Sequence, residues 1–355
     1  MIEKYYNIHN IVKFKIVDRT TLSGKGNFYK EYENFETTEK MDALDFTIHF
    51  GKFTPSNQNC YITESKYYAK KDYFYCKSDS YKFGNWKFEI TGFESDNLAI
   101  RYSSNLIGYL FASQFIIDFP IHFKLNEKGY SIVHGSCVSK DNRAFLFTAR
   151  GGAGKTTIAL NLLERGFSLL GDDLTILNIN KGEVIGFLSP LNIFTYNLTS
   201  FVKEKLGIKN KVVLGLKDLL YKITGGYIKL FTQINAKNIF KEENIIDKSE
   251  LDAIFFLIPK NEFRVDYMSK QELIDHLLIN QKLETPFFYK YMLEYSYMFP
   301  ESKLSTHWKQ YKKNLETNLP DDIPICKIEV PRKYDSKVSE KILEVIKNEC
   351  AEQSS

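Results

Sequence analysis

The stretch Ala149-Arg150-Gly151-Gly152-Ala153-Gly154-Lys155-Thr156-Thr157 decides the fold. It follows an apolar run over residues 144–148, typical of a buried strand, and precedes a helical pattern over residues 158–166. A strand, a glycine-rich turn with Lys-Thr and a helix are together the context of a phosphate-binding loop. Backbone N–H groups of such a loop converge at a helix N-terminus and bind polyphosphate. The stretch therefore predicts a site for a nucleoside triphosphate, with ATP as the expected cofactor.

The loop residues have distinct expected roles. Lys155 would reach the β- and γ-phosphates, and the Thr156 hydroxyl would coordinate Mg²⁺. Ala149 stands where the usual pattern has its first glycine, a position whose side chain does not contact phosphate. A glycine-rich turn that contains Lys-Thr by chance is the alternative. Glycines let the backbone approach the phosphates without a Cβ clash; in this loop they are Gly151, Gly152 and Gly154.

Two adjacent carboxylates follow the loop. Asp172 and Asp173 come 17 and 18 residues after Lys155, at the end of a short apolar run over residues 167–170. One helix and one strand fill that interval, so we expect the pair at a strand end beside the loop. One carboxylate there can hold Mg²⁺, and a second can accept the proton of an attacking hydroxyl. An ordinary turn is the alternative.

A histidine and two arginines are further candidates. His134 lies 21 residues before Lys155, on a strand expected next to the loop strand. A lone histidine on an apolar strand is more often a hydrogen-bonded core residue than a catalyst. Arg150 could neutralise charge on the γ-phosphate, as an arginine supplied in cis can, or could point to solvent. Arg264 is a weaker candidate for the same role.

In order and spacing, these features resemble the HPr kinase/phosphorylase family, whose fold is related to that of phosphoenolpyruvate carboxykinases. The resemblance implies an α/β fold with a P-loop nucleotide-binding domain. It makes Asp172 the general base, Asp173 a Mg²⁺ partner, and His134 a polar neighbour of Asp172 or of the transferred phosphate. It covers about residues 130–187 and continues more weakly to the C-terminal strand and helix. The segments that carry it are 132–135, 149–157, 164–167 and 171–173.

The chain also departs from that family. No arginine occurs between Arg165 and Arg264, so the Arg-Gly-rich signature that follows the Asp pair in the family is missing. The phosphorylase activity, and HPr as the substrate, are therefore not implied. The chain resembles a divergent HPr-kinase-like kinase; some such relatives phosphorylate a Ser of a ribosomally made peptide, and others act on small molecules. Family enzymes are often hexamers, which makes a homo-oligomer an expectation here.

The length of 355 residues predicts two domains. Residues 1–104 alternate apolar and polar side chains between turn residues, which indicates a β-rich N-terminal domain. Residues 105–355 would form the kinase domain. The aromatic cluster of the first domain could be a recognition surface, but the core and edges of a β-sandwich are the favoured interpretation. Its members are Tyr67, Tyr68, Tyr73, Phe74 and Tyr75.

Periodicity predicts the remaining elements. A helix over residues 107–119 is expected to end at Pro120, and Ser269 with Glu272 forms a capping box that begins a helix. Asp141-Asn142 predicts a turn, and Gly225-Gly226 a long loop. The predicted strands are 131–138, 174–178, 184–187, 253–258 and 325–330. The predicted helices lie within 198–246, 269–279, 286–316 and 336–347.

Composition limits the partners. The net charge of +4, from 48 basic and 44 acidic residues, argues neither for nor against nucleic acid. The Lys-rich stretch 202–248, with Tyr221, Tyr227 and Phe231, is more typical of a solvated face, so nucleic-acid binding is not expected. The most apolar run, residues 107–123, is interrupted by polar residues and too irregular to span a bilayer. We expect a soluble cytoplasmic protein with no membrane partner.

The five cysteines are far apart and include no C-x-x-C pair. Free thiols in a reducing cytosol fit that pattern better than disulfides or a zinc site do.

The sequence thus predicts an ATP-dependent kinase that transfers the γ-phosphoryl group of MgATP to a hydroxyl acceptor. A Ser of a protein or peptide is the first expectation and a small-molecule alcohol the second, with the N-terminal domain recognising the acceptor. Two alternatives remain open: a sensor or scaffold that binds ATP without transfer, and an ATPase coupled to a conformational change.

Overall fold

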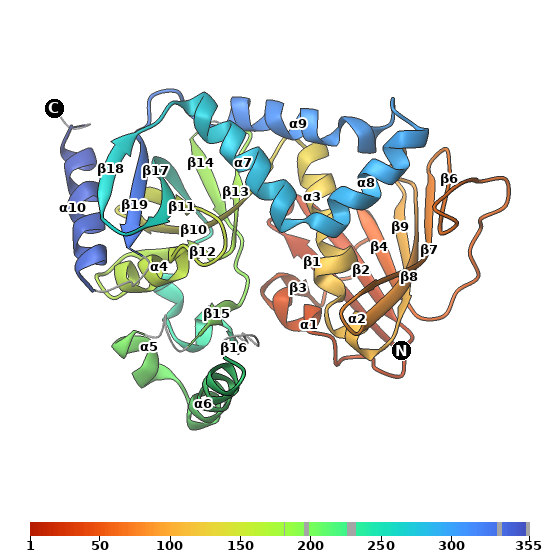
Figure 1. Cartoon of the computed structure of the whole chain (residues 1–355), viewed down its shortest axis with the longest axis horizontal. Coiled ribbons are helices and arrows are strands. Elements are labelled where there is room, and N and C mark those ends of the chain that lie inside the picture. Colours follow the sequence, from red (N-terminus) through yellow and green to blue (C-terminus); the bar gives the residue numbers. More distant parts are fainter. Residues whose placement is uncertain (181, 195–198, 226–231, 332–335, 353–355) are drawn as a thin grey trace. The chain divides into compact units, whose positions relative to one another are not determined.

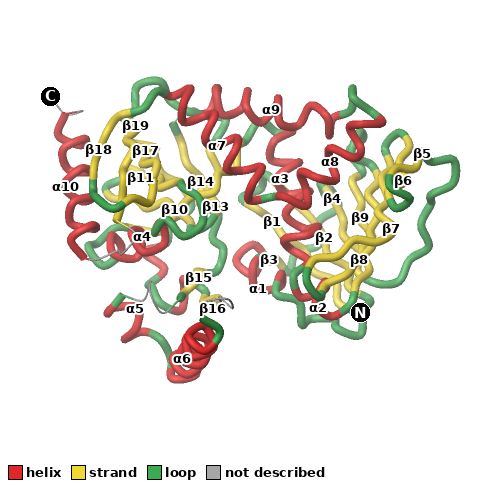
Figure 2. The backbone as a smooth tube through the Cα atoms, viewed as in Figure 1, coloured by secondary structure: helices red, strands yellow, loops and turns green. Residues whose placement is uncertain are grey.

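The computed structural model describes residues 1–180, 182–194, 199–225, 232–331 and 336–352. It divides into two compact units (Figures 1 and 2). Unit 1 comprises Met1–Tyr130 and Lys282–Asn314, and unit 2 comprises Ser131–Gln281 and Leu315–Ser355. These units differ from the expected division after residue 104, because residues 105–130 and a segment close to the C-terminus pack with the N-terminal strands.

Unit 1 is built on one nine-stranded sheet in the order β3-β1-β2-β4-β9-β8-β7-β6-β5. The pairs β2–β4 and β4–β9 are parallel and the other pairs are antiparallel. The expected sandwich is wrong, because helices rather than a second sheet cover these strands. The strands are β1 Ile2–Ile8, β2 Val12–Asp18, β3 Glu36–Thr37, β4 Phe46–Phe50, β5 Tyr61–Thr63, β6 Tyr67–Lys70, β7 Tyr73–Tyr81, β8 Gly84–Thr91 and β9 Leu98–Ser104.

Aromatic side chains join the helices of unit 1 to its sheet. On α8 (Pro286–Met298), Tyr291 lies 4.7 Å from Phe88 and Tyr295 lies 4.7 Å from Phe93, measured between ring centroids. Four members of the aromatic cluster are buried, and Tyr68 is half-buried. The cluster therefore belongs to the core, which is the interpretation that the sequence favoured. The remaining helices are α1 Phe28–Glu31, α2 Leu106–Leu110, α3 Asp118–Glu127 and α9 Lys303–Asn318.

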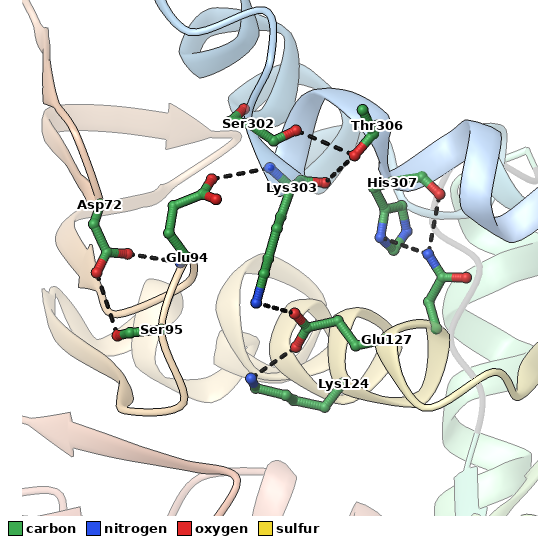
Figure 3. Close-up of polar contacts among 10 residues, drawn as sticks. Asp72, Glu94, Ser95, Lys124, Glu127, Ser302, Lys303, Thr306 and His307 are labelled. Atoms are coloured by element: carbon green, nitrogen blue, oxygen red, sulfur yellow. Dashed lines mark hydrogen bonds and ion pairs between the residues drawn. The ribbon is translucent and has the colours of Figure 1, made fainter.

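The segment 282–314 is fixed to unit 1 by polar contacts at the start of α9 (Figure 3). The Lys303 N–H donates to Glu94 Oε1 at 2.9 Å, and Lys303 Nζ pairs with Glu127 Oε1 at 2.9 Å. Lys124 Nζ pairs with the other oxygen of Glu127 at 2.7 Å. One glutamate thus joins two lysines from segments that lie far apart in the sequence.

Pro120 does not end a helix. A short helix, α2, and a π-helical turn over Ser113–Ile117 precede it, and α3 continues to Glu127. Pro120 is the third residue of α3, in the first turn, where backbone N–H groups have no partner within the helix. The residue therefore costs no hydrogen bond of α3, and the expected end at Pro120 is wrong.

Unit 2 contains an eight-stranded sheet in the order β11-β10-β13-β14-β17-β19-β18, with β12 paired to β10. Because β17 also pairs with β11, the strands β11, β10, β13, β14 and β17 form a closed ring of hydrogen-bonded neighbours. The strands are β10 Ser131–Lys140, β11 Arg143–Thr148, β12 Ser168–Gly171, β13 Leu174–Leu177, β14 Glu183–Gly186, β17 Lys248–Lys260, β18 Arg264–Tyr267 and β19 Ile325–Pro331.

The elements predicted for this unit are confirmed. Asp141 and Asn142 form a two-residue hairpin turn with φ of 54° and 61°, the left-handed values that such turns require. The Glu272 N–H donates to Ser269 Oγ at 3.1 Å, which is the N-cap half of the capping box. Helices α4 Lys155–Leu163, α5 Ser200–Lys205, α6 Ile208–Ile223, α7 Lys270–Glu284 and α10 Ser336–Glu352 complete the unit, together with a separate ribbon of β15 Leu191–Ile193 and β16 Thr232–Ile234.

The structure also bears on the expectations for the cysteines, for membrane-spanning helices and for the loop around residue 225. Cys60, Cys76, Cys137 and Cys326 are free thiols. Among the described residues, no helix is both long and apolar enough to cross a membrane. Gly226, Tyr227 and Phe231, which belong to the predicted loop and to the aromatic residues of the Lys-rich stretch, lie outside the described residues.

Candidate active site

The glycine-rich loop, residues 149–154, connects the carboxyl end of β11 to the first turn of α4. Gly152 and Gly154 have φ of 86° and 94°, in the left-handed region that favours glycine. A Cβ added at Gly151 or Gly152 would meet no heavy atom of the protein within 4 Å. The loop therefore offers an open backbone surface beside a helix N-terminus, as a phosphate group requires.

Lys155 begins α4 and folds its side chain back over the loop. The side chain is only 5% exposed, and Nζ donates to the Ala149 carbonyl at 2.9 Å. Nζ also lies 3.0 Å from His134 Nε2. Burial, with the charges of Lys155 and Arg150, lowers the pKa of His134 to about 3. The imidazole is therefore neutral near pH 7, and Nε2 accepts a hydrogen bond from the lysine ammonium.

Asp172 and Asp173 lie between two strands, β12 and β13, that pair with β10 in one continuous antiparallel register. β10 pairs with β12 up to Cys137↔Gly171 and with β13 from His134↔Leu174, and the two aspartates fall between these pairs. Asp173 has φ of 69°, and its carbonyl accepts a hydrogen bond from the Gly135 N–H at 3.1 Å. In this register Asp172 lies opposite Ser136, and Asp173 lies opposite Gly135. The two aspartates directly follow the end of β12 at Gly171, which is the strand end that the sequence predicted.

Gly135 has a packing role in this arrangement. A Cβ at Gly135 would come within 2.8 Å of the Phe147 carbonyl oxygen on β11. The glycine after His134 therefore lets the loop strand approach β10 closely.

Asp172 is buried beside the loop, with 1% of its surface exposed. Ser136 Oγ donates to its carboxylate, and Thr156 Oγ1 lies 3.0 Å from both carboxylate oxygens and donates to them. Burial raises the pKa of Asp172, while the hydrogen bonds from Ser136 and Thr156 and the charge of Lys155 oppose that rise. The carboxylate is consequently a stronger base than an ordinary aspartate and is held in one orientation.

Asp173 is half-buried and faces different neighbours. Asn192 Nδ2, on β15, donates to Asp173 Oδ2. The structure thus distinguishes the two aspartates, because Asp172 contacts the phosphate loop through Thr156 and Asp173 contacts the β15–β16 ribbon.

Parts of the chain are similar to known proteins. No family model matches the chain. The chain is 39% identical over 85 residues to the HPr kinase/phosphorylase of Chlorobium limicola, which is 24% of this chain and 23% of that protein. It is 41% identical over 56 residues to the Chloroherpeton thalassium enzyme of the same name, and this match covers 16% of this chain and 16% of that protein. It is 41% identical over 63 residues to the Chlorobium luteolum enzyme, and this match covers 18% of this chain and 19% of that protein.

The chain is HPr kinase-like. The matched segments span less than a quarter of the length of each curated relative. A solved structure, the Hpr(Ser) kinase/phosphatase of Coxiella burnetii, covers 63% of this chain and 99% of its own. Its identity of 13% and TM-score of 0.29 are too low for any residue of the site to be compared.

The structure brings four of the predicted site residues into contact and excludes another. His134, Lys155, Thr156 and Asp172 form one connected set. Arg150 is exposed. Arg264 lies on β18, 66% exposed at its side chain, and pairs with Asp266 at 3.0 Å, so it belongs to a surface ion pair.

Four residues of the site were missed in the sequence. Ser136 follows His134 by two positions on β10, so the period of a strand could have placed both side chains on one face. Ser189 Oγ donates to the Asp172 carbonyl at 2.7 Å, and Asn192 holds Asp173, but no motif marks either residue. Asn280, near the end of α7, donates to the Ala149 carbonyl at 3.4 Å from more than a hundred residues away.

The oxygen donors at this candidate site fit Mg²⁺. Thr156, Asp172 and Asp173 offer a hydroxyl and carboxylates, which are the hard ligands that Mg²⁺ prefers. Within the described ranges, no group of three or more His, Cys, Asp or Glu could hold a metal ion alone. Mg²⁺ commonly binds through one or two carboxylates together with substrate phosphates and water. The donor set therefore suits a metal that arrives with a nucleotide.

Proposed function

We propose that this HPr kinase-like chain is an ATP-dependent phosphotransferase that moves the γ-phosphoryl group of MgATP to a hydroxyl, most simply a Ser of a protein or peptide. The observation that carries the proposal is the contact between Thr156, at the start of the loop helix, and the buried Asp172. That contact joins a phosphate-binding element to a carboxylate whose pKa burial raises. The kinase names of the relatives support the same assignment.

Residues 149–157 would bind the nucleotide. The open backbone of the loop and the N-terminus of α4 receive the phosphates, and Lys155 turns its ammonium from the Ala149 carbonyl toward them. His134 is a neutral hydrogen-bond acceptor that keeps the Lys155 ammonium at the loop and does not neutralise its positive charge. It acts as a positioning residue for Lys155.

Thr156 and Asp173 would hold Mg²⁺. The Thr156 hydroxyl donates a hydrogen bond to Asp172, so the lone pairs of its oxygen remain available to a cation. Asp173, oriented by Asn192, would supply the carboxylate. When bound, Mg²⁺ would neutralise charge on the β- and γ-phosphates.

Asp172 would be the general base. Its raised pKa brings it closer to the pH of the reaction, which favours acceptance of the proton from the acceptor hydroxyl. Ser136 and Thr156 fix the carboxylate, and positioning of this kind supplies much of the catalysis in phosphoryl transfer.

The proposal is tested by transfer from γ-labelled ATP with Mg²⁺ in a lysate of the source cell. We expect wild type to label a protein or peptide and Lys155→Ala to label nothing. A labelled metabolite would identify a small-molecule kinase. Binding of MgATP without any labelled product would assign the chain to the ATP sensors, and hydrolysis that saturates with ATP alone would identify an ATPase; either result would contradict the proposal.

Ser136→Ala should shift the pH dependence of transfer. Asp172 must be ionised to accept a proton, so kcat/KM falls as the pH falls through its pKa. The Ser136 hydrogen bond favours the ionised form, and its loss raises the pKa of Asp172 further. We expect the acidic limb of the kcat/KM profile to move to higher pH by about one unit.

Ser139→Ala is the matched control for that shift. Ser139 is buried on the same strand, and its Oγ lies 2.8 Å from Ser249 Oγ. An unchanged limb in Ser136→Ala, or an equal shift in both variants, would show that Ser136 does not act through Asp172.

A further inference from the structure

Helix α6 in unit 2 packs through one side and exposes an apolar face on the other. Leu214 is buried in the core of the unit, and Lys217 Nζ donates to Thr232 Oγ1 on β16 at 3.2 Å. The exposed residues recur at intervals of four, four, three and four, so they share one helix face. They are Ile208, Val212, Leu216, Leu219 and Ile223, with exposed fractions of 82%, 56%, 62%, 53% and 73%. We call them the α6 face.

A row of exposed aliphatic side chains on one helix marks a surface that binds a partner. Single exposed hydrophobic residues are ordinary, but five on one face of a 16-residue helix form a continuous stripe. We therefore expect the stripe to bind a partner that has an apolar surface of similar length.

The charge around the α6 face is strongly basic. Residues 200–225 contain six lysines and two acidic residues, which gives a net charge of +4. That value equals the net charge of the whole chain, so the remaining residues are balanced. Lys203, Lys205, Lys209 and Lys211 are exposed. A complementary occupant carries acidic residues beside its apolar ones.

The α6 face is also connected to the candidate active site. Thr232, which receives the hydrogen bond from Lys217, is paired with Ile193, next to Asn192 in the β15–β16 ribbon. Asn192 in turn donates to Asp173. Figure 1 shows α5, α6 and this ribbon grouped together within unit 2. The same short ribbon therefore contacts both α6 and Asp173.

We propose that the α6 face docks the phosphoacceptor polypeptide, through an amphipathic segment of that acceptor with acidic residues along its edges. The inference rests on the proposed function for the role of the partner. A second copy of this chain fits less well, because two α6 faces would bring their lysines together. An anionic membrane matches the charge, but only an acceptor accounts for the connection of α6 to Asp173.

A binding experiment tests the docking independently of catalysis. The probes are two fluorescent model helices without Ser or Thr, one of Leu and Glu and one of Leu and Lys. Fluorescence anisotropy should show that wild type binds the Leu/Glu helix, more weakly as salt rises, and does not bind the Leu/Lys helix. The variant Leu216→Gln/Leu219→Gln should bind the Leu/Glu helix at least about tenfold more weakly.

Leu293→Gln is the matched control, since Leu293 is an exposed leucine, at 52%, on helix α8 of unit 1. It should bind the Leu/Glu helix as wild type does. Failure of wild type to bind that helix, or equal binding by the double variant, would overturn the docking.

The labelling assay then separates the docking from the proposed function. The double variant should lose acceptor labelling in the lysate while its MgATP affinity stays that of wild type. If wild type labels no acceptor, the proposed kinase fails; if both label equally, the docking alone fails. Two further outcomes would overturn the docking if wild type does not bind the Leu/Glu helix. Binding to phosphatidylserine vesicles that depends on Leu216 and Leu219 would assign the α6 face to a membrane, and dimerisation that depends on them would assign it to a second copy.

Discussion

Asp172→Asn is expected to lower the rate of phosphoryl transfer by about 10²–10⁴-fold, the usual contribution of a general base. The amide has nearly the volume of the carboxylate, and its oxygen can still accept hydrogen bonds from Ser136 and Thr156. It cannot accept a proton from the acceptor. The rate of labelling of a fixed acceptor fraction at saturating MgATP measures the loss, and equilibrium binding of a fluorescent ATP analogue should be nearly unchanged.

Asp173→Asn is the comparison that separates the two carboxylates. As a Mg²⁺ partner, Asp173 should be replaceable in part by a higher concentration of free Mg²⁺, so transfer by this variant should recover as Mg²⁺ is raised. Transfer by Asp172→Asn should not recover. The opposite pattern, with rescue of Asp172→Asn alone, would exchange the two roles, and wild-type transfer by Asp172→Asn would remove the base from the mechanism.

Unit 1 is expected to lose stability steeply in mild acid because it buries two neutral histidines. Burial lowers the pKa of His122 to about 4, and burial with the nearby His122 lowers that of His307 to about 3. In the unfolded chain a histidine has a pKa near 6.5, so below that pH the unfolded chain binds protons that the buried histidines of the folded unit do not bind. The free energy of unfolding should therefore fall by about 1.4 kcal/mol per pH unit for each histidine, between about pH 6.5 and 4. Asp118 of the same unit offsets about one histidine's share of this loss, because burial raises its pKa to about 7 and the folded unit takes up that proton first.

Intrinsic fluorescence can follow this loss, because both tryptophans of the chain, Trp86 and Trp308, lie in unit 1. The urea midpoint should drop from pH 7 to pH 5, and His307→Gln should reduce the drop. Asn126 Nδ2 lies 3.0 Å from His307 Nδ1, a contact that a glutamine oxygen can also accept. His276→Gln, at a partly exposed position on α7, is the control. An equal pH dependence in wild type and His307→Gln would show that this histidine is not the cause.

The sequence was most informative where function and fold are local. The loop over residues 149–157 specifies its own conformation, since Gly152 and Gly154 adopt the left-handed values that glycine permits. The interval to Asp172 contains one helix and one strand, which fixed the expectation that the carboxylates lie near the loop. The pairing on either side of the two aspartates escaped prediction, because β10 pairs with both β12 and β13 and sequence periodicity does not reveal a shared partner strand.

The sequence was least informative about which elements pack together. Alternation over the N-terminal strands predicts one buried face, but it does not say whether a sheet or a helix covers that face. Tyr291 and Tyr295 cover Phe88 and Phe93 from a helix some two hundred residues later in the sequence, and no local signal links them. For the same reason Asn192 and Asn280 entered the site only through the structure: each is placed by tertiary packing.

The interleaved order of the two units has a consequence for biosynthesis. Unit 1 lacks α8 and most of α9 until about residue 314 has been made. Unit 2 lacks β19, which lies between β17 and β18 in its sheet, until residue 331. Domains generally fold as units, from the N-terminus onward, as the ribosome makes them. Here neither unit can close its core early, so most of the chain leaves the ribosome with apolar strands uncovered. A nascent chain stalled near residue 280 would contain the whole sheet of unit 1 without α8 and α9, and the sheet of unit 2 without β19, and would complete neither unit.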